Sequence, residues 1–263
     1  MMEPLVSILM PTYNRPNYFE QALQSALAQT YTSTEIVVSD NSENHLTENI
    51  VKSWQTSAGG EKIRYIRNKQ NIGPIANIQQ SLRLAKGEFI NYLNDDDLFH
   101  PRKIEKMMEH MQKDRRIVLV TSPRRVIDGN GNRLYVPPLW TFQKLYASDR
   151  RVSGRELSRK MLKDKTNYLG EPTTVLFRRS ALKEPFGMLG GKQVYFAVDL
   201  ASWLNLLTQG DAVYVSEPLS FLRYHPKQLS RHKDAEKIKQ MDVQTFKNFA
   251  RSQGYLNGKA EIR

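Results

Sequence analysis

The first 120 residues of the chain alternate short apolar runs with amphipathic segments, and this alternation limits the folds open to it. The apolar runs lie at residues 6–10, 35–39, 63–66, 88–93 and 117–121, and each has the length of a buried strand. Helical spacing of apolar side chains marks the intervening segments, as at Phe19, Ala22, Leu23, Ala26 and Leu27. Strands and helices in alternation form βαβ units, which predicts an α/β fold with a mostly parallel central sheet flanked by helices.

The second half of the chain is less regular. It predicts strands at residues 173–177, 212–215 and 219–224, a helix at 199–207, and a turn at Asp128-Gly129-Asn130-Gly131-Asn132. A basic helix is predicted from about residue 230, with apolar side chains along one face. The predicted organisation is therefore a regular half (1–122), a smaller mixed half of the same domain (123–229) and a basic helical segment (230–263).

The formal net charge is +12, which favours anionic partners such as phosphates, nucleic acid or an anionic membrane. The basic residues are spread along the chain instead of forming one tract, which counts against a nucleic-acid partner. The chain has no cysteine, so disulfides and thiolate metal sites are excluded.

Polar segments follow several of the predicted strands, at residues 11–15, 40–42 and 94–97. In open parallel sheets, ligands bind beyond the carboxyl ends of the strands. We therefore expect these three segments to meet in one crevice.

Asp95, Asp96 and Asp97 come directly after an apolar strand. Adjacent carboxylates repel one another, and Mg²⁺ or Mn²⁺ would compensate them because hard cations prefer oxygen ligands. Few protein ligands are at hand, so substrate phosphates would complete the coordination shell. Two other interpretations remain open at this point: a solvated acidic turn, or Asp97 as the N-cap of the next helix.

With these segments in order, the sequence resembles the family 2 glycosyltransferases, which share the GT-A fold, a Rossmann-like fold. The resemblance is dense over about the first 120 residues. It is carried by the opening strand and Pro11-Thr12-Tyr13-Asn14-Arg15, by Gln29-Thr30-Tyr31, by Ser39-Asp40-Asn41-Ser42, by Asn71-Ile72-Gly73, and by the segment from Lys86-Gly87 to the aspartates.

The resemblance implies a site for a nucleotide sugar in residues 1–122. Asp40 would hydrogen-bond the base, with the loop of Pro11, Thr12 and Tyr13 packed around it. Asp95 would contact the ribose, and Asp96 would bind the metal that bridges the diphosphate. Arg15 and Asn71 complete the residues expected to bind the donor. The sequence departs from the family at Ser39 and Asn94, where many members carry aspartate, and Asn94 puts the strength of metal binding in question.

The second half resembles the family more loosely, and the likeness there implies an acceptor-binding region. Asp199 would be the catalytic base, although an aspartate that opens a helix is often only an N-cap. Glu171 is the second candidate for the base. His225 is expected to reach the metal or the diphosphate, with a surface histidine as the alternative. Arg223 would neutralise phosphate or pair with an acid.

The implied reaction is an inverting transfer from a nucleoside-diphosphate sugar, with UDP as the expected nucleotide, to a hydroxyl of a saccharide or lipid-linked saccharide. A hydroxyl is a poor nucleophile and needs a base, and a cation stabilises the departing diphosphate. Three alternatives stay open: a sugar-phosphate nucleotidyltransferase, a basic nucleic-acid-binding protein, and an inactive relative that binds nucleotide or carbohydrate.

The N-terminal residues lack the pattern of a secretory signal, and the apolar runs fall short of the roughly 20 residues that span a bilayer. We therefore expect a cytoplasmic protein. The basic C-terminal segment is either a peripheral contact with an anionic membrane or the solvated face of a packed helix. The loop at residues 137–149 is hypothesised to close over the site, and the sequence does not indicate an oligomeric state.

Overall fold

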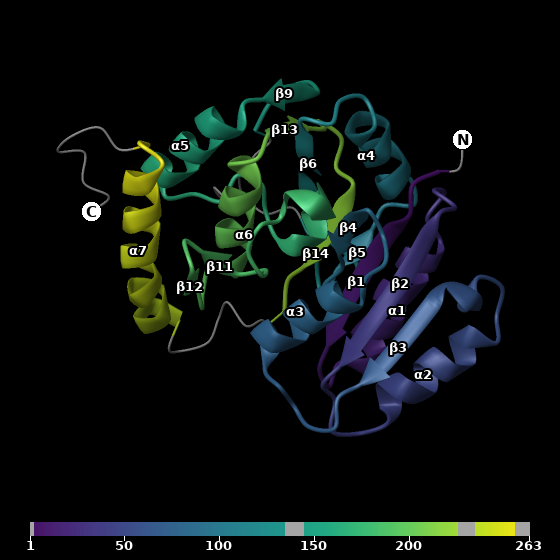
Figure 1. Ribbon diagram of the computed structural model, residues 1–263. Coiled ribbons are helices and arrows are strands. Elements are labelled where there is room, and N and C mark those ends of the chain that lie inside the picture. Colours follow the sequence, from purple (N-terminus) through teal and green to yellow (C-terminus); the bar gives the residue numbers. More distant parts are fainter. Residues whose placement is uncertain (1–2, 135–144, 226–234, 256–263) are drawn as a thin grey trace.

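An eight-stranded sheet runs through the centre of the computed structural model, which describes residues 3–134, 145–225 and 235–255 (Figure 1). Side by side, its strands are β3 (Ile63–Arg67), β2 (Thr34–Asp40), β1 (Val6–Thr12), β4 (Phe89–Tyr92), β10 (Leu176–Arg178), β6 (Ile117–Thr121), β13 (Asp211–Tyr214) and β9 (Arg150–Val152). Strands β1 to β4 pair in parallel, as do β6 and β13, while β10 is antiparallel to both of its neighbours. The predicted mostly parallel α/β sheet is confirmed.

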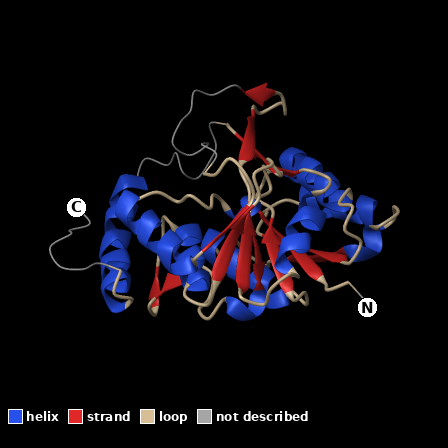
Figure 2. Cartoon of the chain, turned by 90° about the horizontal axis from the view of Figure 1, so that it is seen from above, coloured by secondary structure: helices blue, strands red, loops and turns tan. Residues whose placement is uncertain are grey.

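Helices cover both faces of this sheet, as Figure 2 shows from above. One face packs against α1 (Pro16–Leu27), α2 (Leu46–Gln55) and α4 (Lys103–Met111), and it includes Ile8 and Met10 of β1. The other face, with Leu9 of β1, packs against α3 (Pro74–Leu84), α5 (Gly154–Asp164), α6 (Val198–Leu207) and α7 (Ala235–Ser252). The alternation along β1 explains why both faces are apolar, since successive strand residues point to opposite sides.

A smaller sheet lies beside the large one and combines distant parts of the chain. Its strands are β5 (Leu98–Phe99), β14 (Ser220–Arg223), β7 (Arg124–Ile127) and β8 (Arg133–Leu134), in that order. β5 directly follows the three aspartates, and β14 pairs with it. This pairing brings the residues around 223–225 next to the aspartate run. The turn predicted at residues 128–132 joins β7 to β8 as a hairpin.

The structure differs from the sequence-based expectations in several places. The strand predicted at 173–177 is a 3₁₀ helix, η2 (Pro172–Thr174), followed by the short β10, because Pro172 begins a turn. Helix α5 and strands β5 and β9 were not expected. Helix α4 begins two residues after Pro101. The remaining short elements are η1 (Gly60–Lys62), η3 (Arg179–Ala181), β11 (Met188–Leu189) and β12 (Lys192–Gln193).

The predicted C-terminal helix is present as α7, described from Ala235. Phe246, Phe249 and Ala250 bury its apolar side in the core. Within the described part of the chain, no helix is both long and apolar enough to span a bilayer. Most of the loop at 137–149 lies outside the described residues.

Candidate functional site

The site lies along the edge of the large sheet where the parallel strands end. β1 ends at Thr12, β2 at Asp40 and β4 at Tyr92, and register pairs Thr12 with Asp40. Residues 11–15, 40–42 and 94–97 therefore share one edge, as the sequence predicted. Asp95, Asp96 and Asp97 are 6%, 8% and 1% exposed. This burial contradicts the interpretation of the run as a solvated acidic turn.

The β1 loop holds Asp95. Thr12 Oγ1 donates to Asp95 Oδ2 at 2.8 Å and the backbone N–H of Tyr13 donates to the same oxygen at 3.3 Å. The guanidinium of Arg15 donates to Asp95 Oδ1 at 3.0 Å. Burial, together with repulsion from Asp96, raises the pKa of Asp95 to about 6 against the opposing effect of Arg15. Three expected donor-site residues thus surround one carboxylate.

Asp96 is the meeting point of the two halves of the chain. Its Oδ2 lies 2.8 Å from Nη1 of Arg15 and 3.0 Å from Nε2 of His225, which is 4% exposed. The imidazole and the carboxylate are therefore within hydrogen-bond distance of each other. A carboxylate oxygen and an imidazole nitrogen this close together would both be available to hold Mg²⁺ or Mn²⁺, and they belong to the two residues that the sequence indicated as metal ligands.

The described residues contain no cluster of three or more metal-ligating side chains. A cation held by Asp96 and His225 would therefore depend on other oxygen atoms for the rest of its shell. Diphosphate oxygens and water are ordinary partners of Mg²⁺ when the protein supplies only one or two ligands. The donor set thus fits a metal that arrives with a phosphorylated substrate.

Asp97 has a structural role that the sequence did not reveal. It accepts hydrogen bonds from Thr173 Oγ1 at 2.6 Å, from Asn94 Nδ2 at 3.0 Å and from the backbone N–H of Arg223 at 3.0 Å. Burial, with repulsion from Asp96, raises its pKa well above the ordinary value. Asp97 is not the N-cap of α4, whose cap is Arg102. It connects the end of β4 to η2 and β14.

Asn94 and Arg223 serve the same junction. The side-chain amide of Asn94 donates a hydrogen bond to Asp97. Asparagine at position 94, where many family members carry aspartate, therefore places a neutral donor beside a buried carboxylate. Arg223 is fully buried, and its Nε donates to the backbone oxygen of Asp96 at 2.8 Å. Its other nitrogens reach Gln21 and the carbonyls of Asp128 and Gly129. Arg223 therefore fixes the backbone of the aspartate run from within the protein.

Asp40 lies at the end of β2, inside the protein. It is fully buried, and its carboxylate accepts from the N–H of Ser42 at 2.7 Å and from the Tyr65 hydroxyl at 2.8 Å. Next to it, Ser39 donates to Asn77 at 2.7 Å. Asn71 is exposed and accepts from the N–H of Gly73 at 2.8 Å, which shapes the entry to α3.

The loop after β1 offers exposed groups above Asp40. Tyr13 is 41% exposed, and its hydroxyl donates to Glu43 at 3.0 Å. Asn14 adopts a φ of 53°, and its N–H donates to Ser42 Oγ at 2.9 Å. Pro11 lies within β1, where it pairs with Ser39, and is half-buried. The loop therefore joins the ends of β1 and β2 and leaves one aromatic face exposed to a ligand.

Asp199 lies in the first turn of α6 and is not its N-cap, which is Ala197. Asn167 Nδ2 donates to Asp199 Oδ2 at 2.9 Å, and the N–H of Leu200 donates to Oδ1 at 2.7 Å. Burial raises the pKa of Asp199 to about 6, and the nearby charge of Glu171 acts in the same direction. A carboxylate with such a pKa is suited to take a proton near neutral pH.

Glu171, the second candidate for the base, is already paired. Its Oε2 lies 2.9 Å from Nε of Arg124, whose side chain is 9% exposed. Gly170, immediately before it, has a φ of +90°, and its carbonyl accepts from the indole N–H of Trp203 at 2.9 Å. Asn167 donates to the same carbonyl, so one segment supports both acids. The ion pair with Arg124 therefore already engages the Glu171 carboxylate, whereas Asp199 accepts only from N–H groups of Asn167 and Leu200 among the contacts described.

Two contributors to this region carried no signal in the sequence. Asn167 orients Asp199, but an isolated asparagine in an irregular segment matches no motif. Lys103 is fully buried, and its Nζ donates to the carbonyl of Thr174 at 3.0 Å, which supports η2 from below. Burial lowers the pKa of this amine well below its ordinary value. Thr173 lies in η2, and its contact with Asp97 was not expected from the sequence.

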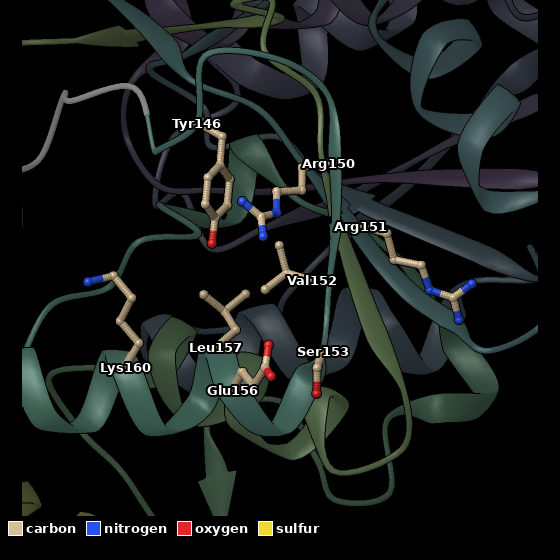
Figure 3. A pocket seen from close by; sticks show the side chains of 8 residues that line it. All are labelled: Tyr146, Arg150, Arg151, Val152, Ser153, Glu156, Leu157 and Lys160. Carbon is tan, nitrogen blue, oxygen red and sulfur yellow. The ribbon is translucent and has the colours of Figure 1, made fainter.

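A pocket of about 230 Å³ lies elsewhere, between β9 and the start of α5 (Figure 3). The guanidinium carbon of Arg150 lies 5.1 Å from the centroid of the Tyr146 ring. Arg151 points away from that pair and forms ion pairs with Asp114 and Asp211. None of the residues predicted for the donor or the metal lines this pocket. We therefore assign the functional site to the aspartate edge.

Comparison with known proteins agrees with this geometry. The family model for Glycosyl transferase family 2 matches residues 7–186, more than half of the sequence. The chain belongs to glycosyltransferase family 2. The matched span runs from β1 through η2 and β10, so it contains the donor loop, Asp40 and the aspartate run. The resemblance seen in the sequence is thereby confirmed.

An uncharacterized glycosyltransferase of Rickettsia felis is 40% identical over 139 residues, which are 51% of this chain and 22% of that protein. The chain thus spans only part of that relative. Among solved structures, S. aureus TarS 1-349 in complex with UDP-GlcNAc has a TM-score of 0.68 at 18% identity, covering 91% of this chain and 66% of TarS. A mannosyltransferase of Pyrobaculum calidifontis, PcManGT, in complex with GDP-Man and Mn²⁺, has a TM-score of 0.58 at 18% identity, covering 99% and 66%. These likenesses establish the shared GT-A fold.

Proposed function

We propose that this family 2 glycosyltransferase moves a sugar from a nucleoside diphosphate, UDP in the first instance, to a saccharide or lipid-linked saccharide hydroxyl, with inversion. One observation carries the proposal. At the carboxyl ends of the parallel strands, Oδ2 of Asp96 lies 3.0 Å from Nε2 of His225, and the neighbouring Asp95 accepts a hydrogen bond from Thr12 at the end of β1. This arrangement supplies a place for a diphosphate and its counter-ion. The complexes of TarS with UDP-GlcNAc and of PcManGT with GDP-Man and Mn²⁺ support the same substrate class.

The donor would lie across the ends of β1 and β2. The exposed ring of Tyr13 would stack on the base, and Asp40 at the end of β2 would accept a hydrogen bond from it in addition to those from Ser42 and Tyr65. Asp95 would accept from the ribose hydroxyls, and Arg15 would move from the two carboxylates towards the phosphates. Asn71 and Pro11 would border the base.

Asp96 and His225 would hold Mn²⁺ or Mg²⁺. When bound, such a cation neutralises the charge that grows on the departing diphosphate. The chain's own part is to keep the two ligands close together. Asp97 and Arg223 do this by fixing the backbone of the aspartate run to β14.

Asp199 would take the proton of the acceptor hydroxyl as that oxygen attacks the anomeric carbon. The bond from the anomeric carbon to the diphosphate breaks, and the electron pair leaves with the nucleotide. A single displacement requires no covalent enzyme intermediate, so one base on the acceptor side suffices. Asn167 would hold the carboxylate in place.

A nucleotide-release assay tests this function directly. UDP-, GDP- and dTDP-sugars are incubated with the protein in Mn²⁺, in Mg²⁺ and in a chelator, and the free nucleoside diphosphate is measured. We expect metal-dependent release from one donor class, with slow hydrolysis when no acceptor is present. Pyrophosphate as the product would indicate a nucleotidyltransferase instead, and donor binding without any release would indicate an inactive relative.

The pKa of Asp199 predicts how turnover depends on pH. The base must be ionised, so kcat/KM is expected to rise about tenfold per pH unit below about 6 and to level off above it, with the pKa at about 6. The measurement is the initial rate of nucleotide release from pH 5 to 9 at fixed metal. Asp199→Asn should abolish the inflection. A profile with the same inflection in that variant would assign it to another group.

A further inference from the structure

Helix α6, which carries Asp199, begins without a cap of its own. Its N-cap is Ala197, one of the residues least suited to that position, and no side chain within the turn caps it. The first turn of a helix presents backbone N–H groups that need partners, and it carries the positive end of the helix dipole. The N–H of Ala197 belongs to this set, and its partner has to come from another part of the chain.

Asp242 of α7 supplies that partner. Its Oδ1 accepts from the N–H of Tyr195 at 2.9 Å, and its Oδ2 accepts from Phe196 at 2.7 Å and Ala197 at 3.2 Å. Asp242 is only 2% exposed. Three successive N–H groups that converge on one carboxylate form an anion-binding nest. The negative charge also faces the start of α6, where it is favourable.

The part of α7 that follows Asp242 is packed into the core of the protein, so Asp242 is a rigid support. Phe246, Phe249 and Ala250 are buried in the core cluster that also contains Trp203 of α6. Trp203 in turn donates to Gly170, next to Glu171. The C-terminal helix is thus connected to the acceptor side both through the core and through the entry of α6.

We propose that Asp242 is a positioning residue, which holds the entry of α6 so that Asp199 faces the acceptor. Ala197, whose N–H donates to Asp242, lies two residues before Asp199. Loss of the Asp242 carboxylate would therefore displace Asp199 more than it displaces the other residues of the site. The inference rests on the proposed function insofar as Asp199 is the base. It gives the C-terminal helix, which the family match at residues 7–186 does not cover, a part in the reaction.

The first test is amide hydrogen exchange on the full chain without donor, comparing Asp242→Ala with the native protein. Exchange at Tyr195, Phe196 and Ala197 is expected to accelerate by about tenfold or more, since all three amides lose their common acceptor. Amides of β1 and β4 serve as the internal reference and should keep their native rates. Native exchange rates at residues 195–197 in the variant would overturn the anchor.

The second test separates positioning from a loss of folded protein. Rates of nucleotide release are divided by the number of donor-binding sites counted by calorimetry. Asp242→Ala is expected to lower kcat by about 10- to 100-fold with the donor KM within about twofold, because a small displacement of a catalytic group is costly. Asp242→Asn retains one acceptor oxygen, so its kcat should lie between that of the native protein and that of Asp242→Ala. Gln244→Ala is the matched control, since Gln244 is exposed on the same helix and bonds only to Asn248 among the bonds described.

The two tests fail in different ways. Accelerated exchange with unchanged kcat per site would overturn the positioning role. An equal loss of donor affinity and kcat would also overturn it, because it would indicate general damage. A native protein that releases no nucleotide from any donor would overturn the proposed function and with it the role of Asp199, while the exchange result would still decide the anchor.

Discussion

Replacing Asp96 with alanine is expected to lower metal-dependent nucleotide release by about a thousandfold or more in kcat/KM. Asp96 contacts both Arg15 and His225, so its loss would remove a proposed metal ligand and separate the two halves of the site. His225 alone would retain a cation poorly, because a single imidazole does not satisfy a hard ion. The donor should bind more weakly as well, since its diphosphate is held through the cation.

The measurement is release of nucleoside diphosphate across a Mn²⁺ titration, with binding of the donor followed by calorimetry. Asp164→Ala is a suitable control, because Asp164 forms an ion pair with Lys160 on the protein surface. Asp96→Asn should recover only part of the metal affinity, since it keeps an oxygen but loses the charge. Unchanged metal dependence in Asp96→Ala would reject the assignment of this carboxylate.

Asp199→Asn is expected to reduce transfer by about 10²- to 10⁴-fold, the usual contribution of a positioned general base. Asparagine keeps the shape and one of the two hydrogen bonds that the carboxylate accepts from Asn167 and Leu200, but it cannot accept a proton. Donor and metal binding should stay within about twofold, because the contacts of Asp199 within the described residues go to Asn167 and Leu200 and not to residues 11–15, 40–42 or 94–97. The effect should therefore fall on kcat, in contrast to that of Asp96→Ala.

The same substitution should stabilise the protein at neutral pH. The folded-state pKa of Asp199 is raised to about 6 from 3.8, so the folded state disfavours the charged carboxylate. This cost is absent below pH 3.8, grows as the pH rises towards 6, and is constant above it. Asp199→Asn should accordingly raise Tm at pH 7.5, by about 2–4 °C for each kcal/mol recovered, and the gain should vanish near pH 4.

Thermal unfolding at the two pH values, together with transfer rates, distinguishes a base from a structural carboxylate. Glu171→Gln is the matched comparison, since Glu171 lies near Asp199 but is paired with Arg124. It should be less damaging to kcat and should lower Tm, because it breaks an ion pair in which Arg124 is nearly buried. If Glu171→Gln were the more damaging of the two for kcat, the roles of the two acids would be exchanged.

The sequence predicts the donor side of this fold well because regular periodicity dominates there. Every strand of the β1 to β4 series and every helix between them lies where the apolar spacing placed it. The positions of residues 11–15, 40–42 and 94–97 followed from one rule about parallel strands. The depth of Asp40 and the structural role of Asp97 did not follow, since both depend on partners such as Tyr65 and Thr173 in other elements.

The second half of the chain was harder to predict, because its contacts also depend on partners in distant elements. Its strands are two to four residues long, too short for a period of two to be visible. Asn167 and Asp242 act through bonds to residues 32 and 45 to 47 positions away, which no local pattern encodes. Asp199 was identified only through the family resemblance, because spacing alone could not distinguish it from a helix cap.

The position of β10 affects how the protein must be made. β10 pairs with β4 on one side and with β6 on the other, so the large sheet is joined across its middle by residues 176–178. Until that segment leaves the ribosome, β4 has an open edge along residues that are fully apolar or buried in the finished protein. The nascent donor half is thus exposed to unwanted strand pairing for more than 50 residues of synthesis after β6. A truncated chain that ends before β10 should aggregate. The number of residues between β6 and β10 sets how long the edge of β4 stays unpaired during synthesis.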